Sequence, residues 1–135
     1  MRKALIGLLL GFSLLAQPPD ELAEARKLFE DRRFSEAEVS CLDRIRQLTA
    51  SGRFESFQTS LAQGLLARIY VLQGKVPQAV SLAEESLLRA ERLVPPNDLR
   101  LDEPIDNLAF VHRWNGYTAQ SRLLLERLLR MRENH

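Results

Sequence analysis

The sequence contains few of the residues from which metal centres and nucleophilic active sites are built. Cys41 is the only cysteine, so no disulfide can form within the chain, and His112 and His135 are the only histidines. The patterns H-E-x-x-H, C-x-x-C and G-x-S-x-G are absent, and no glycine-rich phosphate loop precedes a helix. These absences predict a protein with no catalytic residues, no metal site and no cofactor.

The chain also lacks a strong charge of either sign. Its formal net charge is +1, with 19 basic and 18 acidic side chains, so the overall charge does not favour binding to nucleic acid or to an anionic membrane. Hydrophobic residues make up 45% of the chain and charged residues 27%, which indicates a folded globular protein. Without disulfides, such a domain has to be held together by its apolar core.

Long hydrophobic runs are missing except near the start. The stretch ALIGLLLGFSLLA, residues 4–16, follows the basic Arg2 and Lys3 and precedes the polar QPPDE. This order predicts a secretory signal peptide over residues 1–16, which would be removed after Ala16. The run is shorter than the roughly 20 apolar residues of a membrane-spanning helix. We therefore expect an exported protein, periplasmic or secreted, that is not inserted in a membrane after signal removal.

Strand signals are absent, and helical periodicity dominates residues 17–135. Helix-start residues and turn glycines divide this part into six predicted helices, which form three hairpins. Ser35, followed by Glu38 three residues later, predicts a capping box at the start of the second helix. The predicted helices cover about residues 18–29, 35–48, 55–73, 77–93, 103–114 and 117–131.

The three hairpins repeat with a period of 42 residues and no gaps. Small residues recur on both helices, where close approach of an antiparallel pair requires them. A single hairpin cannot bury its apolar faces, whereas three stacked hairpins can. The recurring sets are Ala25, Ala67 and Ala109; Leu28, Tyr70 and His112; Arg32, Gly74 and Gly116; Ala37, Ala79 and Ser121; Cys41, Ala83 and Leu125; and Ile45, Leu87 and Leu129.

This arrangement resembles the tetratricopeptide repeat. The stretches LARIY (66–70) and LAFVH (108–112) carry the leucine, small residue and following large residue of its first helix, and Ala79-x3-Ala83 matches its second. The longer period, with IDNLA (105–109) and RMRE (130–133), is similar to the kinesin-light-chain type of repeat. The resemblance implies an all-α fold, a short right-handed α-solenoid of antiparallel helix hairpins, with repeats at about 18–52, 54–94 and 100–133. The first repeat, with Glu24 in place of Leu66 and Leu108, would act as a polar cap.

In such solenoids the first helix of each hairpin lines a concave groove that binds peptides or partner helices. The resemblance therefore implies a protein- or peptide-binding scaffold without catalytic activity. Arginine in the groove would bind carboxylates or carbonyl oxygens, the Asp106–Asn107 pair would bind a peptide backbone, and the aromatic residues would act as anchors. The expected partner-binding residues are Arg26, Phe29, Arg68, Leu72, Asp106, Asn107, Phe110, Arg113 and Trp114.

The last predicted helix suggests an alternative function. Its stretch LLLERLLRM distributes leucines over more than one face, and the preceding hairpin can cover only one of them. An apolar surface there would invite self-association. The alternative is therefore a structural self-assembly module, a homo-oligomer joined through Leu124, Leu128 and Met131.

Cys41 and His112 occupy positions that the repeat register places inside the fold. We interpret both as packing residues, and His135 as part of the chain terminus. A third hypothesis, an enzyme or metal site centred on His112, has no second histidine or cysteine near it in sequence to support it.

Overall fold

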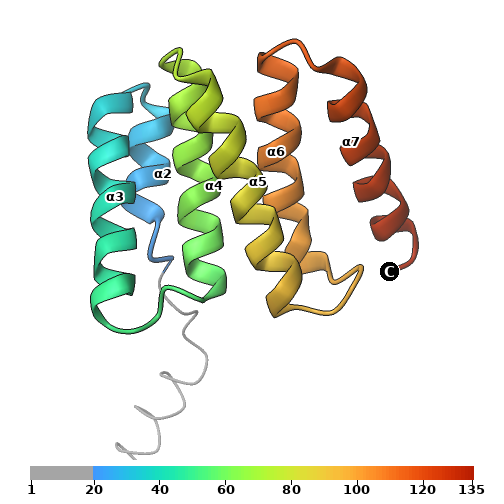
Figure 1. Cartoon of the computed structure of the whole chain (residues 1–135), viewed down its shortest axis with the longest axis horizontal. Coiled ribbons are helices and arrows are strands. Elements are labelled where there is room, and N and C mark those ends of the chain that lie inside the picture. Colours follow the sequence, from blue (N-terminus) through green and yellow to red (C-terminus); the bar gives the residue numbers. More distant parts are fainter. Residues whose placement is uncertain (1–19) are drawn as a thin grey trace, which may run out of the picture.

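A computed structural model describes residues 20–135, and these form six α-helices and one short 3-10 helix (Figure 1). The predicted signal peptide lies outside the described residues. The helices are α2 (Ala23–Glu30), α3 (Phe34–Ala50), α4 (Phe57–Leu72), α5 (Val76–Leu93), η1 (Leu99–Leu101), α6 (Asp102–Trp114) and α7 (Thr118–Glu133).

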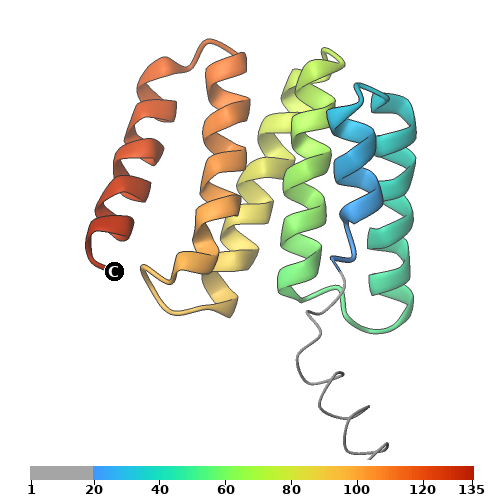
Figure 2. The same cartoon turned by 180° about the vertical axis from the view of Figure 1, so that it is seen from behind.

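The helices pack as adjacent antiparallel pairs, α2 with α3, α4 with α5 and α6 with α7, and the three pairs stand side by side (Figure 1). Helices α2, α4 and α6 form one layer, which faces the viewer in Figure 2, and α3, α5 and α7 form the other. Each pair contacts the next through its neighbouring helices, α3 with α4 and both α4 and α5 with α6. The predicted all-α stack of hairpins is confirmed.

The hairpin turns show why the 42-residue register holds. Arg32, Gly74 and Gly116 all adopt positive φ, at 61°, 82° and 83°. In each hairpin the residue after this position donates its N–H to a carbonyl of the preceding helix, as Arg33 does to Leu28 over 2.9 Å. Glycine adopts this left-handed conformation without steric cost, whereas in Arg32 the Cβ makes the same conformation unfavourable. The first repeat therefore uses the same turn with a less suitable residue.

The recurring small residues are buried where the two helices of each hairpin pack together. Ala25, Ala67 and Ala109 are at most 2% exposed, and so are Ala37 and Ala79 on the second helices. Ser121 takes the same place in the third hairpin, where its hydroxyl donates to the Ala109 carbonyl over 3.0 Å.

The core is built from two connected clusters. One joins α2, α3 and α4 around Ile69, and the other joins α4 through α7 around Leu101 and Ile105. Cys41 is fully buried in the first cluster, as the register predicts, and burial raises the pKa of its thiol to about 12.

Local start signals were less reliable than the register. The predicted capping box at Ser35 is wrong, because α3 begins one residue earlier and its capping position, Arg33, makes no side-chain cap hydrogen bond. Arg33 instead donates from Nε to Glu36 over 2.9 Å. At the start of α4, Ser56 does act as a side-chain cap and accepts the Thr59 N–H over 3.3 Å.

Candidate interaction groove

Three adjoining hollows lie along the layer formed by α2, α4 and α6. We call the whole surface the groove. A charged hollow of about 380 Å³ occupies its centre, and an aromatic hollow of about 280 Å³ lies toward the hairpin turns. A third hollow of about 250 Å³ opens between α6 and α7. The charged hollow is lined by Arg26, Phe29, Glu30, Leu65, Arg68, Glu103, Asp106 and Asn107, and the aromatic hollow by Phe29, Glu30, Arg32, Phe34, Leu72, Phe110 and Trp114.

Arg68 is the central side chain of the charged hollow. It donates from Nε to Asn107 Oδ1 and from Nη2 to Asp106 Oδ2, each over 2.7 Å. Its guanidinium carbon also lies 4.5 Å from the centre of the Phe110 ring, which is cation–π distance. All three contacts reach from α4 to α6. Arg68 therefore joins the second and third repeats, and a ligand would meet a guanidinium that is already held in place.

Asn107 lies at the base of this hollow rather than on its surface. It is only 4% exposed, and its Nδ2 is buried without a hydrogen-bond partner. The side chain fits against α4 because residue 64 is glycine: a Cβ there would lie 2.2 Å from Asn107 Nδ2. The expected contact between Asn107 and a peptide backbone is therefore not available in this conformation. Asn107 instead orients Arg68.

Arg26 crosses the groove from α2 to α6. Its Nη1 pairs with Glu103, and its Nε pairs with Asp20 over 3.0 Å. Burial disfavours the guanidinium charge, but the two carboxylates outweigh this effect and raise the pKa of Arg26. The ion pair spans the charged hollow, so the first repeat is tied to the third across α4.

The aromatic hollow has two aromatic walls. On one side Phe29 and Phe34 lie with ring centres 5.7 Å apart and tilted by 58°, and on the other Phe110 and Trp114 stack at 5.9 Å and 15°. Leu72 of α4 lies half-buried between them. Trp114 remains 59% exposed. An aromatic-walled hollow open to solvent is suited to an apolar side chain of a partner.

The sequence-predicted groove residues thus fall on one face. All nine of them line the hollows of the groove, and they come from all three repeats. Arg113 lines the third hollow, where it is exposed and lies 5.9 Å from the centre of the Phe110 ring. The residues brought together are Arg26, Phe29, Arg68, Leu72, Asp106, Asn107, Phe110, Arg113 and Trp114.

The prediction of an association surface named the wrong side of α7. Leu128 is 3% exposed and Met131 is 2% exposed, because both pack into the core against the neighbouring helices. Leu124 is half-buried beside them. The exposed leucines of this helix are Leu123, Leu125 and Leu129, at 64%, 40% and 57%.

His112 is a packed side chain. It is 8% exposed, its ring centre lies 5.8 Å from that of Tyr117, and its Nδ1 is buried without a hydrogen-bond partner. Burial lowers the pKa of His112, and Glu84 opposes this only weakly. Within residues 20–135 no group of three or more histidine, cysteine, aspartate or glutamate side chains is placed to hold a metal ion.

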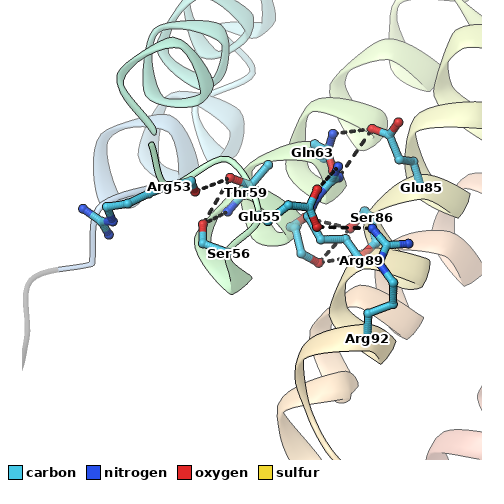
Figure 3. Close-up of polar contacts among 10 residues, drawn as sticks. Arg53, Glu55, Ser56, Thr59, Gln63, Glu85, Ser86, Arg89 and Arg92 are labelled. Atoms are coloured by element: carbon cyan, nitrogen blue, oxygen red, sulfur yellow. Dashed lines mark hydrogen bonds and ion pairs between the residues drawn. The ribbon is translucent and has the colours of Figure 1, made fainter. Parts of the chain in front are cut away.

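A polar cluster around the buried Arg89, at the contact between α4 and α5, was not predicted (Figure 3). Arg89 is 4% exposed and donates to Glu55 over 3.0 and 3.1 Å and to Gln63. Its hydrogen bond is the main cause that lowers the pKa of Glu55. The 42-residue register could have predicted that Arg89 is buried. Arg89 is equivalent to Met131 of the third repeat, which is a core residue.

Beside Arg89, Ser60 of α4 and Ser86 of α5 form hydrogen bonds between the same two helices. The Ser60 hydroxyl donates to the Ser86 carbonyl and the Ser86 hydroxyl donates to the Ser60 carbonyl, both over 2.7 Å. Most buried polar atoms in proteins have a hydrogen-bond partner. The cluster satisfies its own members across one hairpin, which indicates a structural role.

None of the helices within residues 20–135 is long and apolar enough to cross a membrane.

A comparison with known protein families finds a match in the middle of the chain. Residues 59–99 match the family model of the tetratricopeptide repeat, a segment that includes most of α4 and all of α5. The match supports a repeat protein of the tetratricopeptide type. The chain has no significant match among curated proteins or solved structures.

Proposed function

We propose that this chain is an exported protein- or peptide-binding scaffold that acts through the groove and catalyses no reaction. Repeats of the tetratricopeptide type generally mediate protein interactions. The observation that carries the proposal is the aromatic hollow, in which side chains of all three repeats surround a space open to solvent. A binding surface of this kind exists only when the repeats are stacked.

Recognition would rest on one apolar side chain of the partner. Burying a side chain of leucine or phenylalanine size contributes about 1.5–3 kcal/mol. The walls are held rigid, because Phe110 packs against both Trp114 and the fixed guanidinium of Arg68. Rigid aromatic walls bind with little loss of conformational entropy. The charged hollow beside them would accept the polar part of the same partner segment.

The charged hollow would set orientation more than affinity. Arg68 and Arg26 already have carboxylate partners within the chain, so a ligand carboxylate would have to compete with Asp106 or Glu103. Exchange of one ion pair for another in a solvated groove yields little net free energy. We therefore place the affinity in Phe29, Leu72, Phe110 and Trp114.

Trp114 is a built-in reporter, because it is the only tryptophan in the chain and lines the aromatic hollow. We would select peptides from a random library on the purified protein and titrate them while recording tryptophan emission. Entry of an apolar side chain beside the exposed ring should shift the emission to shorter wavelength.

The variants Phe29→Ala and Leu72→Ala keep the reporter and open the opposite wall and floor. Each should weaken peptide binding at least about tenfold, or 1.4 kcal/mol. Leu88→Ala is the matched control, since Leu88 is 58% exposed on α5, in the other layer. Peptides that bind without changing the emission, or that bind Phe29→Ala as tightly as the unaltered protein, would place the site elsewhere.

Export is the second part of the proposal and rests on residues 1–16 alone. Mass spectrometry of the protein recovered from cell fractions would test it. A mature chain that begins at residue 17 and is found outside the cytoplasm is the expected result. An intact N-terminus in the cytoplasmic fraction would contradict export. It would not affect the proposal that the groove binds a peptide.

A further inference from the structure

The outer side of α7 carries the positions that, in the first two hairpins, contact the next hairpin. Leu125 stands 42 residues after Ala83 and 84 after Cys41, both of which are fully buried. Leu129 likewise follows Leu87, which is 6% exposed. In the third repeat, by contrast, Leu125 and Leu129 are 40% and 57% exposed. These positions belong to an inter-repeat contact that the described residues leave uncovered.

The hollow of about 250 Å³ between α6 and α7 belongs to the same contact. Its lining includes Ala109, Ser121 and Leu125. The corresponding residues of the second repeat are Ala67, Ala79 and Ala83, which form one core cluster with Leu108 and Val111 of α6. The third repeat therefore leaves open a position that α6 covers in the second repeat, and Arg68, Asp106 and Arg113 line the rest of the hollow.

Four charged residues flank these leucines with alternating sign: Arg122, Glu126, Arg130 and Glu133. The ion pairs that α7 makes within the described chain come from other residues, Arg127 with Glu91 and Arg132 with Asp102. The four flanking charges are exposed and so remain available to a partner.

We propose that α7 pairs with α7 of a second copy of this chain, antiparallel and about a two-fold axis. An antiparallel pairing centred between residues 127 and 128 places Arg122 opposite Glu133 of the other copy. In the same register Leu125 lies within one residue of Leu129 of the other copy, and Glu126 lies within one residue of Arg130. Because a two-fold interface repeats every contact, all four charges find opposite partners twice. The pattern is self-complementary, and this identifies the occupant as a second copy.

Head-to-tail stacking of copies fits the residues less well. In that arrangement α2 of one copy would cover α7 of the next as α4 covers α3. The residues of α2 that stand where Leu66 and Ile69 do are Glu24 and Lys27. Both are exposed in this fold, and covering Leu125 and Leu129 with them would bury charges without partners.

Sedimentation of the purified protein tests the proposal. We expect a monomer–dimer equilibrium with no larger species, because a two-fold contact closes. Leu129→Glu should weaken the dimer at least about 100-fold by burying an unpaired charge. Leu88→Glu, which adds the same charge at an equally exposed leucine of α5, should leave the equilibrium unchanged.

A charge exchange tests the antiparallel register. Arg122→Glu alone and Glu133→Arg alone should each weaken the dimer about tenfold, since each places like charges together at two points. The double variant should return to within about threefold of the unaltered protein. Circular dichroism confirms that each variant is folded.

Four results would overturn the proposal. The first is a protein that stays monomeric up to about 1 mM, a concentration that detects any dimer more stable than about −4.1 kcal/mol. The second is a dimer that Leu129→Glu leaves intact, and the third is growth into larger oligomers. The fourth is a double variant whose dimer is no tighter than those of the single variants. The aromatic hollow that carries the proposed function is not lined by Arg122, Leu129 or Glu133, so the proposed function can fail or hold separately.

Discussion

Replacing Gly64 with alanine should destabilise this protein, although alanine is the better helix former. Gly64 lies inside α4, where alanine would favour the helix by about 1 kcal/mol. Against this, the new Cβ would lie 2.2 Å from Asn107 Nδ2 and 3.1 Å from its Cγ. Asn107 is 4% exposed and its Oδ1 accepts a hydrogen bond from Arg68, so its amide cannot move without breaking that contact.

The magnitude follows from the contacts that must change. Overpacking a buried site typically costs about 1–3 kcal/mol. Moving the amide also breaks the 2.7 Å hydrogen bond from Arg68 Nε to Asn107 Oδ1, and a hydrogen bond to a charged group contributes about 1.5–3 kcal/mol when buried. Arg68 is partly exposed, which favours the lower figure. After subtracting the helix propensity, we expect a net loss of about 2 kcal/mol.

A double-mutant cycle measured by urea unfolding separates these contributions. In an Asn107→Ala background the clashing atoms are gone and the hydrogen bond is already lost. Gly64→Ala should then be neutral or stabilising by up to about 1 kcal/mol, which gives a coupling of about 2–3 kcal/mol between the two sites. If Gly64→Ala stabilises the unaltered protein, or costs the same in both backgrounds, Asn107 does not occupy the space beside Gly64.

Three further predictions concern single positions. Arg32→Gly should stabilise the fold by about 1 kcal/mol in thermal or urea unfolding, because residue 32 has φ 61° and the equivalent turn residues are glycine; a loss of stability would contradict this. Arg89→Ala should cost about 2–4 kcal/mol, whereas Arg89→Met should stay within about 1 kcal/mol, because the equivalent residue of the third repeat is the buried Met131; equal losses would show that the charge is required. Because burial lowers the pKa of His112 from 6.5, the unfolded chain binds the proton more readily, so stability should fall as pH drops below 6.5; His112→Leu should reduce this slope, and an unchanged slope would assign it to other groups.

The 42-residue register determined more of the fold than any local signal. It required small residues inside the helix pairs and the same turn at residues 32, 74 and 116, and in the structure these small residues are buried and all three turn residues have positive φ. Helix packing imposes these requirements whatever the rest of the sequence is. The capping signal at Ser35 failed because a cap contributes only about 1 kcal/mol, less than the core contacts that set where α3 begins.

The groove could be predicted as a face but not as a set of contacts. Residues of α2, α4 and α6 were expected to share one side, and they line three adjoining hollows. That Asp106 and Asn107 already accept hydrogen bonds from Arg68 depends on the distance between α4 and α6. Gly64 contributes to that distance because it leaves room for the Asn107 side chain. The sequence does not show this role, because Gly64 and Asn107 lie on different helices.

The sequence by itself determined the helical class, the number of hairpins, their period and the buried Cys41 and His112, because hydrophobic periodicity and small-residue spacing act within one helix or between adjacent ones. Only the tertiary structure decided which leucines of α7 are covered. Leu125 and Leu128 are the same residue type three positions apart, yet one is 40% exposed and the other 3%. The difference lies in where α5 and α6 stand, and a helix that is apolar on several sides does not encode which side its neighbours will occupy.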